Sequence, residues 1–258
     1  MANKPKNKPL LIIQLRPEDE TSDNEFQAFL KYGQINASDV RRLRIEQQGI
    51  PADLNIEDYC GIIVGGSPFD ISTPNHQKTA IQHKIESDFS QLLKRIIKLD
   101  YPFLGACSGN GLLGSYLGSP ITGRYSEPVC CRTVQLTDAG RQDSLLKDFP
   151  ETIDVLLGHK EACDCVPANA TLLITGESCP VQMFRVGQNV YATQFHPEGD
   201  ETGFILRINI YKHHGYFKPE QAGQLIDAVR GCNTPYAQEI LRRFVLRAMK
   251  GHSNTFSS

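Results

Sequence analysis

Short apolar runs alternate with amphipathic stretches through the first hundred residues of the chain. The runs at Leu10–Leu15, Tyr59–Val64 and Pro102–Ala106 have the length and apolar content of buried strands. Apolar residues at helical spacing predict a helix over Ser22–Tyr32 and another from Thr73 to Ile97, with the threonine as its N-cap and a proline at its first position. This alternation predicts an α/β fold, in which helices cover both faces of a central, mostly parallel sheet.

Strand patterns dominate the middle of the chain, and helical patterns return near residue 200. Further strands are predicted at Arg41–Glu46, Val129–Leu136, Ile153–Leu157, Thr171–Thr175, Val181–Val186 and Val190–Phe195. Further helices are predicted at Asn110–Leu117, Thr202–His213, Pro219–Arg230 and Pro235–Met249. We therefore expect a flexible N-terminus at 1–8, an α/β domain at 9–214, a C-terminal helical appendage at 215–250 and a flexible tail at 251–258.

Charge and apolar content bear on partners and location. The chain carries 27 Lys and Arg against 29 Asp and Glu, so its net charge of -2 predicts no binding to nucleic acid or to an anionic membrane. Its apolar runs are too short for a signal peptide or a membrane span. We therefore expect an intracellular, cytoplasmic protein.

Eight cysteines raise the question of a zinc site or of disulfide bonds. No two of them are spaced as Cys-x-x-Cys, and no histidine stands at zinc-finger spacing from a pair of them. Where no export signal is present, thiols stay reduced, and buried cysteines behave as small apolar residues. The sequence therefore predicts neither a metal site nor a structural disulfide.

The strongest local motif is the sequence Gly-Ala-Cys-Ser-Gly at 105–109. It follows a predicted strand and precedes a predicted helix, which is the nucleophile-elbow arrangement with cysteine in the place of serine. Glycines leave room for the sharp turn, and the N-terminus of the following helix would favour a thiolate on Cys107. The backbone N–H of Ser108 would face the oxyanion that forms on a substrate carbonyl.

The same stretch fits two other interpretations. Residues 109–114 read Gly-Asn-Gly-Leu-Leu-Gly, the pattern of a dinucleotide-binding turn, and Glu127 lies near the position of its ribose-binding acid. Against this interpretation, the motif stands a hundred residues into the chain, and no predicted strand ends at Glu127. Because the glycines and Cys107 would also suit simple close packing, this stretch alone leaves three interpretations open.

A histidine follows the predicted strand Val190–Phe195, at the edge where ligands collect in parallel α/β sheets. Pro197 favours extended backbone at His196, and residues two apart in extended backbone point to the same side. Glu198 can then hold the imidazole in one tautomer while its other nitrogen faces the Cys107 thiol. Alone, this histidine would be an ordinary surface residue, but with the cysteine elbow upstream we favour a catalytic pair.

Paired glycines end the predicted strand Tyr59–Val64. Gly65 and Gly66, followed by Ser67, would let backbone N–H groups approach a substrate closely and complete an oxyanion hole. A simple strand-ending turn explains the same residues equally well.

Together, these three motifs resemble those of class I, triad-type glutamine amidotransferases, which have a flavodoxin-like α/β fold. The resemblance covers about residues 9–214, and two weaker stretches at 158–161 and 179–184 are similar to the GMP synthetase branch of the family. It implies hydrolysis of the side-chain amide of glutamine, without a cofactor or a metal ion.

The roles of the motif residues follow from the resemblance. The Cys107 thiolate would attack the amide and form a γ-glutamyl thioester, while the N–H groups of Gly66 and Ser108 bind the oxyanion. His196, oriented by Glu198, would protonate the departing ammonia and then activate water to hydrolyse the thioester.

Two departures from the family pattern concern the substrate and the partner. The family usually has a glutamine two residues past the second glycine of the elbow, whereas this chain has Gly111, which offers no side chain to the substrate. Too few residues follow residue 214 for an ATP-using synthetase, so ammonia would pass to a separate synthase subunit or be released. The alternatives are a γ-glutamyl hydrolase or peptidase acting on a larger γ-glutamyl amide, and a non-catalytic nucleotide-binding or regulatory module.

Overall fold

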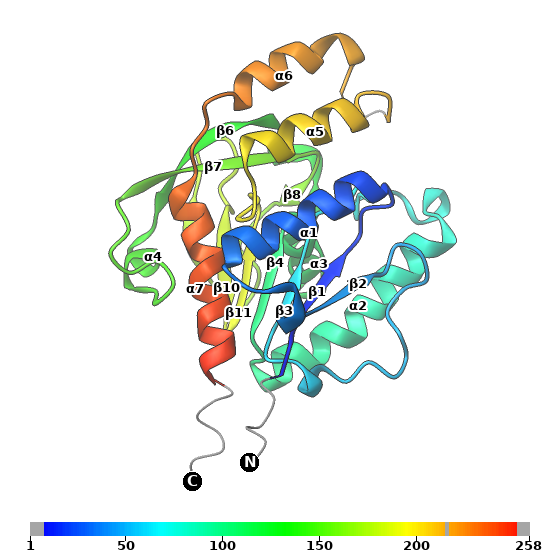
Figure 1. Cartoon of the computed structure of the whole chain (residues 1–258), viewed down its shortest axis with the longest axis vertical. Helices are drawn as coiled ribbons and strands as arrows, with labels where there is room; N and C mark the ends of the chain where they lie inside the picture. The colour runs from blue at the N-terminus through cyan, green and yellow to red at the C-terminus, as the bar shows by residue number, and fades with distance from the viewer. Residues whose placement is uncertain (1–7, 215–216, 252–258) are drawn as a thin grey trace.

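The computed structural model describes residues 8–214 and 217–251, which are built around one large sheet (Figure 1). This sheet has nine strands in the order β2-β1-β3-β4-β11-β10-β9-β6-β7. The strands are β1 (Leu10–Gln14), β2 (Val40–Arg44), β3 (Ile62–Val64), β4 (Phe103–Ala106), β6 (Glu127–Leu136), β7 (Thr152–His159), β9 (Ala170–Thr175), β10 (Met183–Val186) and β11 (Val190–Thr193). All the predicted strands are present, with ends that differ by a few residues.

The sheet consists of a parallel half and an antiparallel half. Strands β2, β1, β3, β4 and β11 pair in parallel, and from β11 through β10, β9, β6 and β7 every pairing is antiparallel. The predicted α/β fold is confirmed, and the parallel part of the sheet is extended by antiparallel strands. Antiparallel neighbours need only a short connection, and β10 and β11 are joined by a tight turn. Gly187 in this turn has a φ of +59°, which glycine adopts without strain.

Helices cover both faces of the sheet, as predicted, and none among the described residues is long and apolar enough to cross a bilayer. The helices are α1 (Asp19–Gly33), α2 (Ala80–Leu99), α3 (Ser108–Tyr116), α4 (Asp138–Gln142), α5 (Glu201–Tyr211), α6 (Ala222–Val229) and α7 (Pro235–Gly251). Short 3₁₀ helices lie at η1 (Ala37–Asp39), η2 (Ile56–Asp58), η3 (Asn75–Gln77), η4 (Gly123–Tyr125) and η5 (Pro219–Gln221). The sequence did not predict α4 or a second, two-stranded sheet of β5 (Ile121–Thr122) and β8 (Ala162–Cys163).

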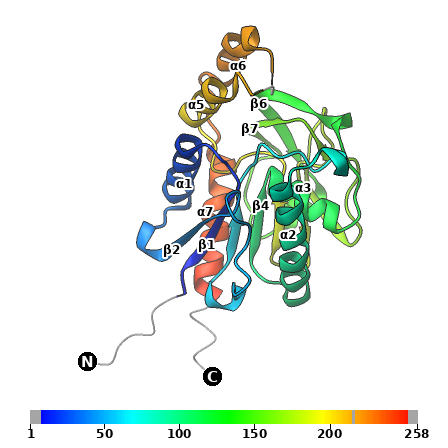
Figure 2. The ribbon, with the colours of Figure 1, turned by 90° about the vertical axis from the view of Figure 1, so that its right-hand side faces the viewer.

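Alternate residues of β1 belong to different cores. Leu10 and Ile12 pack in the cluster that contains residues of α1 and α7, whereas Leu11 and Ile13 pack in the cluster that contains residues of α2 and α3. Successive side chains of a strand point to opposite faces, so a strand covered on both faces is apolar throughout. Figure 2 shows α1 and α7 on one side of the sheet and α2 and α3 on the other.

Helix α2 begins later than the sequence predicted. Thr73 does not cap it; instead Thr79 is the N-cap, and its hydroxyl accepts a hydrogen bond from the Gln82 N–H at 3.3 Å. The Gln82 side chain in turn accepts the Thr79 N–H at 2.8 Å, which completes a capping box. These two bonds satisfy first-turn groups that Thr73 would have left unpaired.

Helix α7 is built into the main core. Its residues Ile240, Leu241, Phe244 and Val245 are buried in the same cluster as β1 and α1. The sequence placed this helix in an appendage at 215–250; α7 covers one face of the sheet, while the boundary at residue 214 stays a prediction. The predicted flexible ends, 1–8 and 251–258, fall almost entirely outside the described residues.

Helices α5 and α6, with η5 between them, form a unit that we call the cap. It packs against β6 and β7 through Leu156, Phe204, Ile208 and Val229, and Figure 1 shows it at the top of the molecule. The predicted helix over 219–230 is split, because its first three residues form η5.

A disulfide joins the cap to the sheet. Cys131 on β6 bonds to Cys232, just after α6, with an S–S length of 2.04 Å and Cα atoms 6.1 Å apart. The prediction of reduced cysteines is therefore wrong for this pair. The two residues are 101 positions apart, and only the folding of the cap onto β6 brings them together, so their spacing carried no signal.

Candidate active site

Cys107 stands at a sharp turn between β4 and α3, as the nucleophile-elbow interpretation predicted. Its φ and ψ are 51° and -97°, a strained conformation for a residue with a side chain. A methyl group on Gly105 would lie 2.7 Å from the backbone of Gly109, so the strand and the helix can approach this closely only because residue 105 is a glycine. The first turn of α3 therefore points its unpaired N–H groups, including that of Ser108, toward the thiol.

The predicted partners of Cys107 follow the neighbouring strand. Strand β11 pairs in parallel with β4, so the residues after the two strands lie at the same edge of the sheet. Cys107 and His196 line the same cavity. Its Nδ1 lies 2.7 Å from Oε1 of Glu198, and the exposed fractions of the two residues are 4% and 0%. The structure thus brings together all three residues that the sequence predicted as catalytic.

The electrostatics of this pair favour two opposite charges. Burial opposes a charge on His196, but the Glu198 carboxylate and the Cys107 thiol outweigh it and raise the His196 pKa from 6.5 to about 9. Burial also opposes a charge on Glu198, but His196 and then Arg207 lower its pKa from 4.5 to about 2. The histidine is consequently ready to give a proton to a leaving group at neutral pH.

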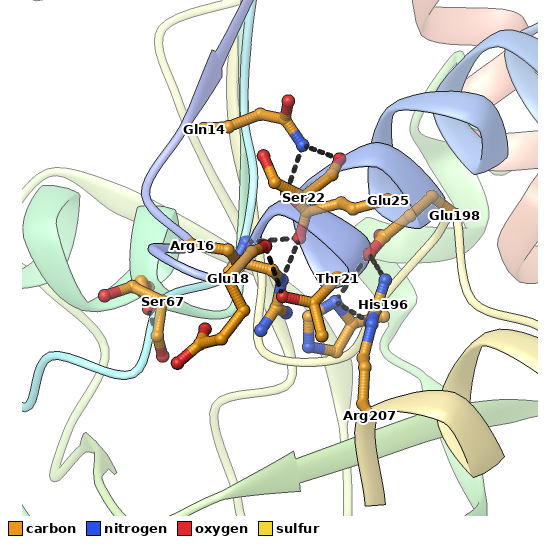
Figure 3. Close-up of polar contacts among 12 residues, drawn as sticks. Gln14, Arg16, Glu18, Thr21, Ser22, Glu25, Ser67, His196, Glu198 and Arg207 are labelled. Carbon is orange, nitrogen blue, oxygen red and sulfur yellow. Dashed lines mark hydrogen bonds and ion pairs between the residues drawn. The ribbon is translucent and has the colours of Figure 1, made fainter. Parts of the chain in front are cut away.

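Arg207 is a site residue that sequence reasoning missed. It comes from α5, and its Nη2 donates to Oε1 of Glu198 at 3.2 Å (Figure 3). The guanidinium also lies over the Phe204 ring, at 5.3 Å from the centroid. The sequence showed only an arginine within the predicted helix at 202–213, and nothing in its spacing connected it to Glu198.

In the loop that was predicted to bind the oxyanion, the buried Glu25 carboxylate already accepts a hydrogen bond from a backbone N–H. The Gly66 N–H donates to Oε1 of Glu25 at 3.2 Å, and a methyl on Gly65 would lie 2.5 Å from Oε2 of the same residue. Arg16 donates its Nε to Glu25 Oε1 at 2.7 Å, and Gln14 donates its Nε2 to Oε2 at 2.9 Å (Figure 3). Sequence reasoning missed Arg16 and Glu25, and with Glu25 in this position the Gly66 N–H already has an acceptor.

Two cavities meet at Cys107. The larger, of about 480 Å³, is lined by His196, Arg16 and Arg207 and by residues of the cap. The smaller, of about 30 Å³, is lined by Gly111 among others, and His196 is not part of its lining. Ser67 and Cys107 line both. The thiol thus borders both cavities, of which only the larger has the volume of a small-molecule site.

The dinucleotide interpretation predicted that Glu127 would face a ribose. Glu127 begins β6 instead of ending a strand, and its Oε2 accepts from Gln182 Nε2 at 2.8 Å and lies 3.1 Å from His159 Nε2. Its carboxylate is thus bonded within the protein instead of being free to accept from a ribose.

Two groups of side chains have the types and closeness of metal ligands. One consists of Glu127, His159 and Cys179, and the other of Glu25, His196 and Glu198, with ligand atoms within 4.8 Å of one another. Each group already holds a hydrogen-bonded pair, and arginines neutralise the carboxylates of the second. The expectation of no metal ion stays a prediction.

Comparisons with known proteins agree with this geometry. The profile of the family "Glutamine amidotransferase class-I" matches residues 25–207. A GMP synthase [glutamine-hydrolyzing] of Petrotoga mobilis is 27% identical over 181 residues, which are 69% of this chain and 32% of that protein. One subunit of the GMP synthase [glutamine-hydrolyzing] of Pyrococcus abyssi is 24% identical over 165 residues, 62% of this chain and 79% of that protein. The chain spans about a third of the length of most of the curated relatives it matches.

Solved structures show the same fold. A glutamine amidotransferase of Thermotoga maritima superposes with a TM-score of 0.72 at 20% identity, over 95% of this chain and 99% of that one. A glutamine amido transferase of Methylobacillus flagellatus has a TM-score of 0.68 at 16% identity, over 93% of this chain and 95% of that one. With its profile match over most of its length and a cysteine elbow facing a His–Glu pair, the chain belongs to the class-I glutamine amidotransferase family.

Proposed function

We propose that the protein hydrolyses the side-chain amide of glutamine through a γ-glutamyl thioester on Cys107. The observation that supports this most is the buried His196–Glu198 pair, whose Nδ1 and Oε1 are 2.7 Å apart, beside the cavity that Cys107 also lines. A strained cysteine at a helix N-terminus, beside a buried imidazole, is the arrangement that activates a thiol as a nucleophile.

The reaction would proceed in two halves. The Cys107 thiolate attacks the amide carbon, and the oxyanion forms next to the Ser108 N–H at the start of α3. His196 gives its proton to the amide nitrogen, ammonia leaves, and the thioester remains. His196 then takes a proton from water, which attacks the thioester and releases glutamate.

Gly66 has a conditional role in this proposal. Its N–H donates to Glu25 in the structure, so it can bind the oxyanion only by exchanging that acceptor for the substrate. Gly65 and Ser67 belong to the same loop, and Ser67 lines both cavities beside Cys107.

The ammonia would pass to a separate synthase protein in the cytoplasm, without a cofactor. The Pyrococcus abyssi relative carries the name of a subunit, which supports a two-protein arrangement. In a reducing compartment, Cys131 and Cys232 would be present largely as thiols.

Glutamine turnover tests the proposal directly. Ammonia and glutamate would be measured with the wild type, with Cys107→Ala and with Cys165→Ala, which removes an exposed free thiol as a matched control. We expect activity in the wild type and the control and none in Cys107→Ala. Undiminished glutaminase activity in Cys107→Ala would overturn the mechanism.

A further inference from the structure

The cavity beside Cys107 is far larger than the leaving group of glutamine requires. Ammonia has one heavy atom, and a cavity that holds a single water needs only about 10–15 Å³. The cavity of about 480 Å³ falls instead in the range of sites for small-molecule ligands.

The position of the general acid assigns this cavity to the leaving side of the substrate. His196 must lie next to the nitrogen that it protonates. It lines the large cavity, whereas the small cavity on the Gly111 side does not include it. A substituent on the leaving nitrogen would therefore enter the large cavity.

The walls of the large cavity differ in chemistry. The cap contributes Phe204, Ile208, Phe217 and Leu225, and β6 contributes Val129, which together make an apolar wall. Such a wall favours a ligand with an apolar side chain, because binding removes the apolar surface of that side chain from water.

Arg16, which also lines the cavity, has an N–H donor to spare. Only 5% of it is exposed; its Nε donates to Glu25 at 2.7 Å and its Nη1 to the Tyr211 hydroxyl at 3.4 Å. Nη2 has no acceptor among residues 8–214 and 217–251. A methyl on Gly66 would lie 2.6 Å from Nη2 and 2.7 Å from His196 Cε1, so the donor and the general acid flank the same point.

A buried guanidinium with a spare N–H group is suited to a carboxylate. In an α-amino acid the carboxylate carbon is two bonds from the nitrogen, so a leaving amino group near His196 would place its own carboxylate near Arg16. The apolar wall would then receive the side chain of that amino acid.

We propose that the large cavity binds the leaving amino acid of a γ-glutamyl dipeptide, with Arg16 on its carboxylate and the cap around its apolar side chain. This inference rests on the proposed role of Cys107. The thiolate attacks the γ-carbonyl, the C–N bond breaks, and His196 protonates the amino group of the departing amino acid. Water then hydrolyses the thioester, so dipeptide and water become glutamate and a free amino acid.

The decisive experiment compares γ-glutamylleucine with γ-glutamylleucinamide, which lacks only the carboxylate charge. We expect the wild type to favour the free acid in kcat/KM by about tenfold or more, as for a hydrogen bond to a charged group. Arg16→Gln should reduce this preference to about one, and Arg16→Lys should retain part of it. An equal preference in the wild type and in Arg16→Gln would overturn the assignment of Arg16.

A second variant tests the apolar wall without disturbing Arg16 and Glu25. Leu225→Ser should lower the kcat/KM ratio of γ-glutamylleucine to γ-glutamylglycine several-fold, because the wall loses apolar surface. An unchanged ratio would show that the cap does not hold the side chain and would overturn that part of the proposal.

Two parallel measurements separate this inference from the proposed function. Calorimetry on Cys107→Ala detects dipeptide binding whether or not the enzyme turns over, and the free acid should bind about tenfold or more tightly than the amide. Turnover of glutamine, with dipeptides neither bound nor hydrolysed, would refute the subsite and leave the glutaminase standing. Glutaminase activity that persists in Cys107→Ala would refute the proposed function itself.

Discussion

The parallel and antiparallel halves of the sheet contribute different things to the site. The parallel half supplies Cys107 after β4 and His196 after β11, from two strands that are hydrogen-bonded neighbours. The antiparallel half, with the cap that packs on it, supplies most of the wall of the large cavity. The reacting groups thus follow two neighbouring parallel strands, whereas most of the cavity wall comes from the cap and the antiparallel strands, and Arg207 of the cap also bonds to Glu198.

The largest expected effect concerns the parallel half. Glu198→Gln keeps the shape of the side chain but removes the charge that holds His196, so turnover should fall by about 10³–10⁴-fold, as in other triads that lose this charge. The matched control is Glu20→Gln, at an exposed position of α1, which should leave turnover unchanged. A loss of less than tenfold in steady-state glutaminase assays would contradict the assigned role.

The same variant should change the pH dependence. The raised His196 pKa stabilises the folded state fully below pH 6.5, and this contribution is lost as pH rises through about 9. The lowered Glu198 pKa stabilises it above pH 4.5, and this contribution is lost as pH falls through about 2. In Glu198→Gln the carboxylate that raises the His196 pKa is absent, so His196 should lose its proton at a lower pH. The alkaline limb of the kcat profile should then move from near pH 9 toward neutral pH.

A smaller effect is expected from separating the cap from the antiparallel half. Replacing Cys131 and Cys232 together by serine should lower the free energy of unfolding by about 2–4 kcal/mol under oxidising conditions, because the link restrains a long loop of the unfolded chain. Denaturant titration measures this, and the wild type treated with a reductant should approach the variant. Equal stability of oxidised and reduced wild type would show that the link contributes nothing.

The smallest effects compare one glycine from each region. Gly105→Ala should lower the free energy of unfolding by about 1–3 kcal/mol, since its methyl would overlap the Gly109 backbone at 2.7 Å. Gly223→Ala in α6 meets no atom within 4 Å and should raise the same free energy by about 0.5–1 kcal/mol. Urea unfolding of both variants decides the matter, and a destabilised Gly223→Ala would mean that the cap is packed as closely as the elbow.

The sequence predicted the parallel half well because its strands are buried on both faces. Leu10 to Ile13 is an unbroken apolar run, since alternate residues enter two different cores. The elbow and the His–Glu pair were predictable because each is a local motif with its own backbone requirement, as the φ of 51° at Cys107 illustrates. The roles assigned to these residues stay predictions until activity is measured.

What the sequence could not predict depends on contacts between distant positions. Arg16 donates a hydrogen bond to Tyr211, and Cys131 forms a disulfide with Cys232. No periodic pattern in the sequence connects the two residues of either pair. In the sequence, Glu25 is one residue of an ordinary amphipathic helix. Its contact with the Gly66 N–H depends on how β3 and α1 pack in the fold. The start of α2 was misplaced for another reason: Thr73 followed by proline has the pattern of a helix start, whereas the capping box of Thr79 with Gln82 sets the start in the structure.

The burial of α7 has a consequence for the synthesis of the protein. One face of β1 and the apolar side of α1 are covered by residues as late in the chain as Ala248. Domains generally fold as units during synthesis, so this face stays open to water and to other nascent chains until that residue emerges from the ribosome. Folding of the catalytic sheet is therefore completed only after nearly all of these residues have been translated, and chaperones that shield apolar surface would act on it until then.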